Sequence, residues 1–422
     1  MDSATPTRTV NPVVQLPVAR RSSAQRAVLH RITLPSLAAV GGGDALALGA
    51  LTLFLTVFGL VMVLSSSSVE ASVAGNPYGD FATQGIAAFV GAGAMLAIAT
   101  RLRTQLLARL APAAFLAAVL LQLLTALTPL GTNIGGNQNW IRIAGVSVQP
   151  SEFVKLGLVL LLASFFSRRP GERLGVRGVL PPVVFTGIAI GSVYLGHDLG
   201  TCLILALIGG GGFLLSNVRL PVLLVLGGGA GALLWVFSQA NGSRTDRLEA
   251  WQNGCTDLLG ACWQTTQAQW ALANGGLTGV GIGNSVSKWF WLPEADNDFI
   301  AAVIGEETGL IGLAVLLGCF VAMAVVLLRI ATRTQDRFTR AAAGMVLAWL
   351  VGQAFANIAV VVGVAPVFGV PLPFVSAGGS SLIANLAAVG CIMALADRPV
   401  AAALPLAHPE HPAGRGRSMG AR

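Results

Sequence analysis

The stretch Lys288–Gly312, KWFWLPEADNDFIAAVIGEETGLIG, begins as a polar, aromatic segment and becomes an apolar run long enough to enter a membrane. Its five carboxylates are Glu294, Asp296, Asp298, Glu306 and Glu307. An ionisable side chain at or inside a spanning segment is costly, and where one occurs it commonly has a function. The stretch therefore predicts a membrane protein with a functional site where this helix begins.

The composition of the whole chain agrees with a membrane protein. Of its 422 residues, 54% are hydrophobic and 10% are charged, whereas a typical soluble domain has about 25% charged residues. The net charge of +8 would suit nucleic acid, but the positions of the basic residues follow membrane topology instead. We therefore expect no nucleic-acid partner. The five Cys and four His show no metal-ligand spacing.

Ten apolar segments are candidates for spanning helices, which need about 20 mostly apolar residues. They lie at 45–65, 82–100, 105–127, 152–167, 178–196, 198–216, 219–238, 298–328, 341–363 and 378–396. The predicted fold is an all-α polytopic membrane protein with about ten transmembrane helices. A segment too long for a simple connection, 239–297, lies between spans 7 and 8 and is predicted to be a large extracytoplasmic loop.

The basic residues predict which side of the membrane each loop faces. With ten spans, most of the 26 Lys and Arg residues fall on one side, which the positive-inside rule assigns to the cytoplasm. Both termini are then cytoplasmic. Residues 1–44 and 397–422 are rich in Arg, Ser, Pro, Ala and Gly and are predicted to be disordered cytoplasmic tails. Residues 45–396 form the predicted membrane domain.

Polar residues gather on the predicted outer side. Glu152 and Lys155 are three residues apart and share one face at the start of the fourth span. They form either a structural ion pair or, with Arg142, a cationic site for an anionic headgroup. Trp140 taken alone is typical of an interfacial aromatic residue. Asp198 either caps the helix that begins at Leu199 or takes part in the chemistry.

The long outer loop carries a glycine pattern and two cysteines. Gly275, Gly276, Gly279, Gly281 and Gly283 predict tight turns with close backbone approach. They form no nucleotide fingerprint, because no strand precedes them. Cys255 and Cys262 form either a disulfide or two free thiols.

Two further helix starts carry polar residues. Glu306 lies about 12 Å along the helix from Asp298, too deep to cap it, and is predicted to take a polar partner. Gly378, Gly379, Ser380 and Ser381 begin the last span, whose outward N-terminus would attract an anion.

Taken together, these segments resemble the FtsW/RodA (SEDS) family of bacterial cell-wall polymerases. The resemblance covers residues 45–396, and the motifs occur in the family's order and spacing. They are QPSEFVK (149–155), DLGT (198–201), GGLTGVGIGNS (275–285), LPEADNDFIAAVIGEETG (292–309) and PLPFVSAGGSS (371–381). The form of the KWFWLPEA segment and the long tails are more similar to the division branch of the family than to the elongation branch.

The resemblance implies a peptidoglycan glycosyltransferase that polymerises lipid II into glycan strands at the outer membrane face during cell division. It assigns the catalytic role to Asp298. The implied substrate-binding residues are Lys155, Glu152, Arg142, Trp140, Asp198, Gln267, Lys288, Ser380 and Ser381, and the structural ones are Glu306, Pro293, Gly378 and Gly379. The implied partners are lipid II, the nascent glycan strand, a class B penicillin-binding protein, other divisome proteins and membrane lipids. The implied location is the division septum of the bacterial cytoplasmic membrane.

The implied reaction needs a general base. An α-linked donor that gives a β-1,4 bond reacts with inversion, so Asp298 would accept the proton of the attacking hydroxyl. Lys155 and Arg142 would stabilise the pyrophosphate leaving group. No protein metal site is predicted; a divalent cation, Mg²⁺ or Mn²⁺, is the one candidate cofactor. The alternatives are a lipid II flippase or other transporter, a scaffold without chemistry, and an elongation-type polymerase.

The sequence departs from the family pattern at four places: His197, the run that begins at Gly135, Asp296 and Phe368. His197 stands where the family usually has Pro. Asp296 adds a negative neighbour to Asp298, which would raise one pKa of the pair.

Overall fold

The computed structural model describes residues 42–73, 75–76, 78–134, 136–143, 146–168, 174–216, 218–238, 248–249, 251–252, 260 and 262–396. The two predicted tails lie outside these residues, apart from residues 42–44. Gly135 and Cys255 also lie outside them, so the predictions made for these positions stay predictions. Every structural statement below concerns the described part of the chain.

Membrane-spanning helices dominate the described part of the chain, where eight helical segments have the length and apolar composition to cross a membrane. They are α1 (Gly43–Val73), α2 (Gly79–Arg101), α3 (Thr104–Leu127), α4 (Pro150–Ser167), α5 (Val176–Tyr194), α10 (Ile300–Arg333), the segment Arg337–Val361 and α13 (Gly379–Ala396). Arg337–Val361 consists of α11 (Arg337–Val346), the π-helical turn η3 (Leu347–Val351) and α12 (Gly352–Val361).

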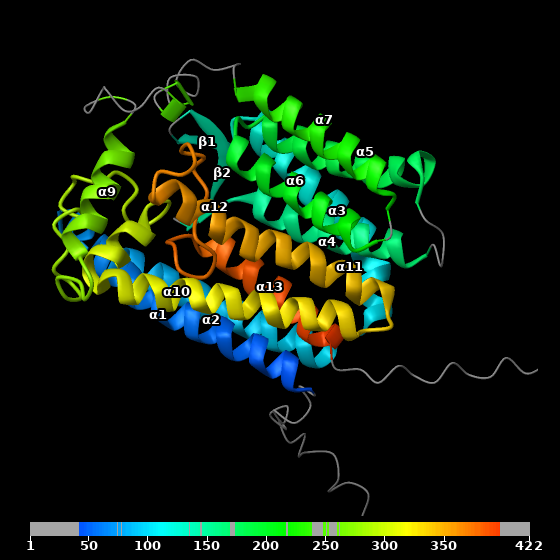
Figure 1. Cartoon of the computed structure of the whole chain (residues 1–422), viewed down its shortest axis with the longest axis horizontal. Helices are drawn as coiled ribbons and strands as arrows, with labels where there is room; N and C mark the ends of the chain where they lie inside the picture. The colour runs from blue at the N-terminus through cyan, green and yellow to red at the C-terminus, as the bar shows by residue number, and fades with distance from the viewer. Residues whose placement is uncertain are drawn as a thin grey trace, which may run out of the picture. The chain divides into compact units, whose positions relative to one another are not determined.

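Two further apolar helices, α6 (Leu199–Leu214) and α7 (Leu220–Ser238), fall at the two remaining predicted spans. The predicted fold class is thereby confirmed. A bilayer offers no water to backbone N–H and C=O groups, so apolar runs of this length form helices, which satisfy those groups internally. Figure 1 shows the helices side by side, and α1 packs against α2, α10 and α13.

Small residues allow these helices to pack closely. A side chain at Gly91 of α2 would lie 2.6 Å from Leu386 of α13, and one at Gly390 of α13 would lie 2.7 Å from the carbonyl oxygen of Met95. The two helices therefore approach at the level of their backbones. Helices in lipid associate chiefly through such packing, because lipid tails are as apolar as the side chains they would exclude.

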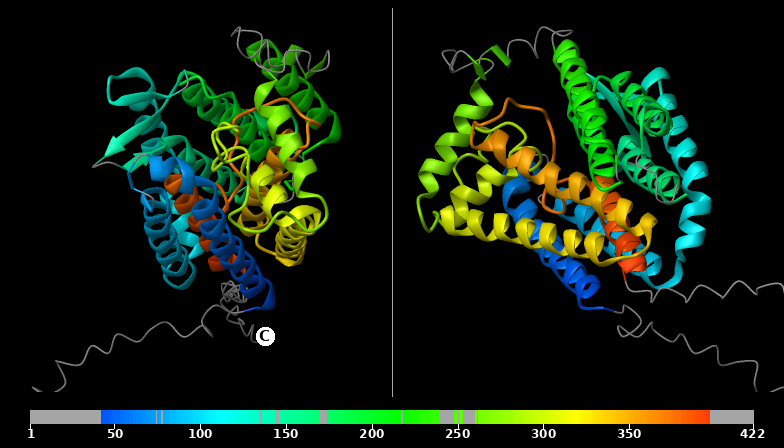
Figure 2. Two further views of the ribbon diagram at one scale, coloured as in Figure 1. Left: turned by 90° about the vertical axis from the view of Figure 1, so that its left-hand side faces the viewer. Right: turned by 45° about the vertical axis from the view of Figure 1, so that its right-hand side comes forward.

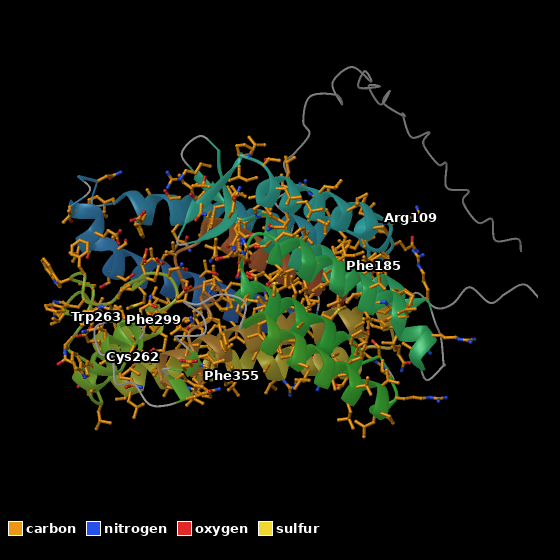
Figure 3. All side chains as sticks on the ribbon, turned by 90° about the horizontal axis from the view of Figure 1, so that it is seen from above. Arg109, Phe185, Cys262, Trp263, Phe299 and Phe355 are labelled. Atoms are coloured by element: carbon orange, nitrogen blue, oxygen red, sulfur yellow. The ribbon has the colours of Figure 1, made fainter. Side chains whose placement is uncertain are left out.

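The two ends of the helices differ in their charge. Arg109, one of the basic residues predicted to face the cytoplasm, lies at the opposite end of the bundle from Trp263 and Phe299 (Figure 3). At the Arg109 end, Asp44 of α1 pairs with Arg329 at 3.8 Å and with Arg333 at 3.0 Å, both on α10. This arrangement agrees with the predicted topology, in which Arg109, Arg329 and Arg333 share one side.

A small sheet at the predicted outer end was not expected. It consists of β1 (Gly131–Ile134), β2 (Asn137–Ile143) and β3 (Val146–Val148), antiparallel in that order. Trp140 pairs with Thr132 on one side of β2, and Arg142 pairs with Ser147 on the other. Strands of three to seven residues carry too little alternation of polar and apolar residues to be recognised in a sequence.

The predicted extracytoplasmic loop contains a helix, α9 (Trp263–Gly275), which runs crosswise to α10 (Figures 1 and 2). The segment after α9 then lies along α10. Val280 and Gly281 donate backbone hydrogen bonds to Glu306 and Glu307 at 3.0 Å each. Returning bonds run from Leu310 to Gly276 at 2.9 Å and from Ile311 to Leu277 at 3.2 Å.

This pairing occurs where α10 is broken. Gly309 has φ 68° and ψ −168°, so the helix is interrupted there and backbone groups on both sides lose their usual partners. The loop supplies those partners. A side chain at Gly275 would collide with the Gly305 carbonyl, and one at Gly279 with that of Glu307. The predicted close backbone approach of this glycine pattern is therefore made to α10.

Candidate active site

A polar cavity of about 590 Å³ lies among residues that are far apart in the sequence. The predicted site residues that line it are Trp140, Glu152, Lys155, Asp198, Pro293, Asp298, Gly378, Ser380 and Ser381. The predicted site residues outside this lining are Arg142, Gln267, Lys288, Glu306 and Gly379. His197 and Phe368, two of the positions at which the sequence differs from the family pattern, also line the cavity.

Four helices begin at this cavity. Gln149 and Asp198, which line it, are the N-cap residues of α4 and α6. Asp298 lies two residues before α10, and Gly378 lies one residue before α13. A helix N-terminus carries unsatisfied N–H groups and a partial positive charge. The convergence of four such ends favours an anionic group in the cavity.

Glu152 and Lys155 form a buried ion pair in the cavity wall. Their charged atoms lie 2.7 Å apart, and each residue is 1% exposed. Lys155 Nζ also donates to Gln353 Oε1 at 3.2 Å and lies 5.1 Å from the centre of the Trp349 ring. Of the two predicted alternatives, the structural ion pair is therefore present. The positive charge of Lys155 is already compensated by Glu152. Glu152 Oε2 has no hydrogen-bond partner among the described residues.

Arg142 does not join this pair in the cavity lining. It is exposed on β2, opposite Ser147 of β3, while Trp140 of the same strand does line the cavity. The structure therefore does not support the predicted joint cationic site of Arg142 and Lys155.

Asp198 caps α6, which is the first of the two roles that the sequence left open. Its Oδ1 accepts a hydrogen bond from the Thr201 backbone N–H at 2.9 Å, which caps α6. Its Oδ2 accepts from the Thr201 hydroxyl at 2.7 Å and from Gln149 Nε2 at 3.1 Å. The cap thereby ties the start of α6 to the start of α4, and Asp198 still faces the cavity.

Asp298 lies between two segments that hold it in place. Asn357 Nδ2 of α12 donates to the Asp298 carbonyl oxygen and to the Val370 carbonyl oxygen, each at 2.7 Å. A side chain at Gly369, which has φ 69°, would lie 3.4 Å from Asp298 Oδ2. The carboxylate of Asp298 therefore faces the loop between α12 and α13, where only a glycine leaves this space open.

Asp296 lies outside the cavity lining and has an altered acidity. Its pKa is raised to about 6, chiefly by burial and to a smaller extent by the negative charges of Glu294, Glu70 and Asp80. The sequence predicted a raised pKa for one member of the Asp296–Asp298 pair. Asp296 is the member with a raised pKa, and burial rather than a neighbouring charge is the largest cause.

Two supporting residues escaped the sequence prediction. Gln84 of α2 donates to the Ser376 carbonyl oxygen at 3.0 Å and accepts from the Gly378 N–H at 3.0 Å. Gln353 of α12 accepts from Lys155 and donates to the Pro371 carbonyl oxygen at 2.7 Å. Each is a polar amide in an apolar span, which is a signal that could have identified both.

Lys288 and Gln267, which were predicted to bind substrate, are both buried away from the cavity lining. Lys288 Nζ pairs with Glu307 at 3.3 Å and donates to the Gly283 carbonyl oxygen at 2.7 Å. Its charge therefore fastens the glycine-rich loop to α10. Glu306, predicted to take polar partners, accepts hydrogen bonds from Asn274 and Ser285. Cys262 is disulfide-bonded, while its predicted partner lies outside the described residues.

The fold and the cavity define a polytopic helical membrane protein with a polar site built at one end of its helices. The family model of FtsW, RodA and SpoVE, described as "Cell cycle protein", matches residues 46–399. The chain belongs to this family, and the resemblance inferred from the motifs is confirmed.

Its relatives include proteins named "Probable peptidoglycan glycosyltransferase FtsW". That of Mycobacterium tuberculosis is 36% identical over 348 residues, which are 81% of this chain and 66% of the relative. The chain thus spans slightly less than two thirds of the mycobacterial protein. That of Coxiella burnetii is 36% identical over 354 residues, 82% of this chain and 94% of the relative.

Solved structures share the fold. One, described as "Structural coordination of polymerization and crosslinking by a peptidoglycan synthase complex", has a TM-score of 0.67 and 26% identity, and the match covers 82% of this chain and 96% of that one. The Thermus thermophilus rod shape determining protein RodA has a TM-score of 0.61 and 24% identity, with 82% and 95% covered.

Proposed function

We propose that this chain is a peptidoglycan glycosyltransferase that polymerises lipid II into glycan strands at the outer face of the bacterial cytoplasmic membrane. The convergence of four helix N-termini on the cavity that holds Asp298 is the observation that carries this proposal. A lipid-linked sugar pyrophosphate brings both groups that such a site suits: a dianionic leaving group for the helix ends and a hydroxyl for a carboxylate.

In the proposed reaction, the GlcNAc 4-hydroxyl of one lipid II attacks the anomeric MurNAc carbon of the growing strand. The new β-1,4 C–O bond forms while the α-linked C–O bond to pyrophosphate breaks, and its electron pair leaves with undecaprenyl pyrophosphate. Asp298 accepts the hydroxyl proton. Such general-base catalysis contributes about 10²–10⁴-fold. Inversion at carbon requires no covalent intermediate with the protein.

The helix ends stabilise the charge that develops on the leaving group. Ser380 Oγ of α13 accepts the Gln149 N–H at 3.1 Å, so its own O–H is available to donate. The positive charge of Lys155 is compensated by Glu152, so the role of Lys155 is to stabilise the start of α4. Glu152 Oε2 is buried and has no partner among the described residues, so the role of Glu152 is to hold the Lys155 ammonium in place. Asp198 keeps the starts of α4 and α6 in register.

A divalent cation, Mg²⁺ or Mn²⁺, is compatible with the cavity only together with substrate. No group of three or more His, Cys, Asp or Glu among the described residues has the arrangement of a metal site. Magnesium, however, is commonly held by one or two carboxylates and substrate phosphates. Asp298 is the carboxylate that would hold such an ion, which would neutralise phosphate charge.

The partner and the cellular place extend the same proposal. The solved neighbour described as a peptidoglycan synthase complex couples polymerisation with crosslinking, which supports a class B penicillin-binding protein as the partner here. The FtsW names of the relatives support a role in division, with other divisome proteins, at the septum. Both termini then lie in the cytoplasm.

The test is Asp298→Asn in the purified full chain with its partner in lipid. Glycan strands made from lipid II in the presence of penicillin are separated on a gel. We expect polymerisation to fall at least about 10²-fold, because the amide cannot accept the proton. The matched control is Asp296→Asn, which changes a carboxylate of the same segment outside the cavity lining. Heat unfolding verifies that both variants fold, and full activity of Asp298→Asn would overturn the assignment.

A further inference from the structure

The surface of α9 and the loop after it is unusual for a segment outside the membrane. Lys288 is the only charged residue between Cys262 and Leu292, and it is buried in its pair with Glu307. This surface therefore carries no exposed charge, whereas about a quarter of the residues in a soluble domain are charged. Its large apolar side chains that are more than half exposed are Trp270, Leu277, Ile282, Val286, Trp289, Phe290 and Trp291.

The contacts of α1 indicate how deep in the membrane this segment lies. Asp44 near the start of α1 pairs with Arg333 at one end of α10, and Ser65 donates to Glu307 near the other end at 2.6 Å. The helix rises about 32 Å between Asp44 and Ser65, at about 1.5 Å per residue. The hydrocarbon core of a bilayer is about 30 Å thick. Because Lys288 contacts both Ser65 and Glu307, its loop lies at the level where the hydrocarbon ends.

The same surface continues into the lipid-facing side of α10. Leu310, Ile311 and Val315 of this spanning helix are more than half exposed, as side chains facing lipid are. Ile311 is joined by its backbone to Leu277, and Leu310 to Gly276. The exposed side chains of the loop therefore extend an apolar surface that already lies in the membrane.

We propose that residues 262–292 form an interfacial element, with Trp270, Trp289 and Trp291 seated among the lipids of the outer leaflet. Trp is enriched at the boundary between headgroups and hydrocarbon because it has an apolar ring and one polar N–H. Exposed apolar side chains at this boundary are buried against the acyl chains, as the apolar faces of interfacial helices are. This lipid contact does not depend on the reaction in the cavity. It revises the prediction that residues 239–297 form a loop wholly outside the membrane.

The test uses the full chain in phosphatidylcholine nanodiscs, with and without bromine on the acyl carbons nearest the headgroup. Bromine quenches the fluorescence of Trp in contact with lipid. We compare the wild type with a variant carrying Trp270→Phe, Trp289→Phe and Trp291→Phe. The lipid-dependent quenching is expected to fall about two-fold in this triple variant, because interfacial Trp residues would be its main source. The control is Trp349→Phe, which removes a Trp that is 0% exposed inside the bundle.

A second variant keeps the result interpretable. Ile282→Trp in the triple-Phe background adds one Trp to the same surface and is expected to restore bromine quenching. If the three Trp residues are quenched by aqueous acrylamide instead, the segment faces water and the proposal is overturned. If neither quencher reaches them, protein covers the surface and the proposal is overturned as well.

Discussion

Single buried charges in this protein depend on their immediate partners. The Lys155 ammonium forms an ion pair with Glu152, donates a hydrogen bond to Gln353 and lies over the ring face of Trp349. A buried charge that loses its partner is strongly destabilising, whereas removal of both charges of a pair is often tolerated. Substitutions in the Glu152–Lys155 pair should therefore have different effects on the free energy of unfolding and on polymerisation.

A comparison of the variant that lacks only Lys155 with the variant that lacks both charges should separate these two effects. Lys155→Met leaves Glu152 buried without its cation, and the free energy of unfolding should fall by about 3–5 kcal/mol. The double variant with Glu152→Gln should regain most of that stability without regaining polymerisation, since Lys155 no longer donates to Gln353, which holds the Pro371 carbonyl in the cavity wall. Heat unfolding in detergent and the lipid II gel assay measure the two effects. Equal losses of stability in both variants would contradict the ion-pair interpretation.

Asp296 should make stability depend on pH. Its pKa is raised from 3.8 to about 6 in the folded protein, so between these values the folded state binds more protons than the unfolded state. Stability must then fall as the pH rises from about 4 to 6, and it stays lower above that range. Asp296→Asn removes the titrating group and keeps its shape.

The melting temperatures of wild type and Asp296→Asn should therefore be close at pH 4 and should separate by pH 7, with the variant higher. Asp80→Asn is the matched control, because it removes one of the weaker causes of the shift and should have a smaller effect. A difference between Asp296→Asn and wild type that is the same at both pH values would exclude this mechanism.

Among the helices, α10 shows how a loop can complete a broken span. Non-helical backbone at membrane depth is tolerated only where protein satisfies its polar groups. Here the backbone of residues 276–281 does so on both sides of Gly309. The break separates a first part of α10, buried from Ile300 to Glu307, from a second part that faces lipid at Leu310 and Ile311.

Gly309→Ala should weaken this junction. Its φ of 68° is unfavourable for Ala, and the new methyl group would collide with backbone atoms of Leu277 and Gly279. Strain of this kind costs about 1–3 kcal/mol before the collision is counted. Gly318→Ala on the same helix is the control, because nothing lies within 4 Å of the added methyl group. It should be neutral or stabilise by up to about 1 kcal/mol. Similar unfolding temperatures for both variants would contradict this role of Gly309.

The assembled molecule brings its site together from distant parts of the chain. The starts of α4, α6, α10 and α13 meet around one cavity, and Gln84 of α2 and Asn357 of α12 hold the loops between them. Each helix contributes its N-terminus, so the electrostatic character of the site is set by the backbone as much as by side chains. Strand β2 and residues 366–371 of the loop before α13 also contribute to the cavity lining.

The sequence by itself determined the membrane fold, the positions of the apolar helices along the chain and the family. These follow from apolar length, from the positions of basic residues and from motifs that are local in the chain. It also selected Asp298, Glu152, Lys155 and Asp198 as candidate site residues, because charged side chains are rare in spanning segments, and the structure brings all four to the cavity lining.

Only the tertiary structure decided what each polar residue contacts. Both Lys288 and Lys155 were predicted from the sequence to bind substrate. In the structure, Lys288 holds a loop to Glu307, whereas Lys155 lines the cavity beside Glu152. The partners of Gln84 and Gln353, and the pairing of the glycine-rich loop with α10, could likewise not be read from the sequence. The physical reason is that these contacts join residues far apart in the chain, and their partners are set by how the helices pack.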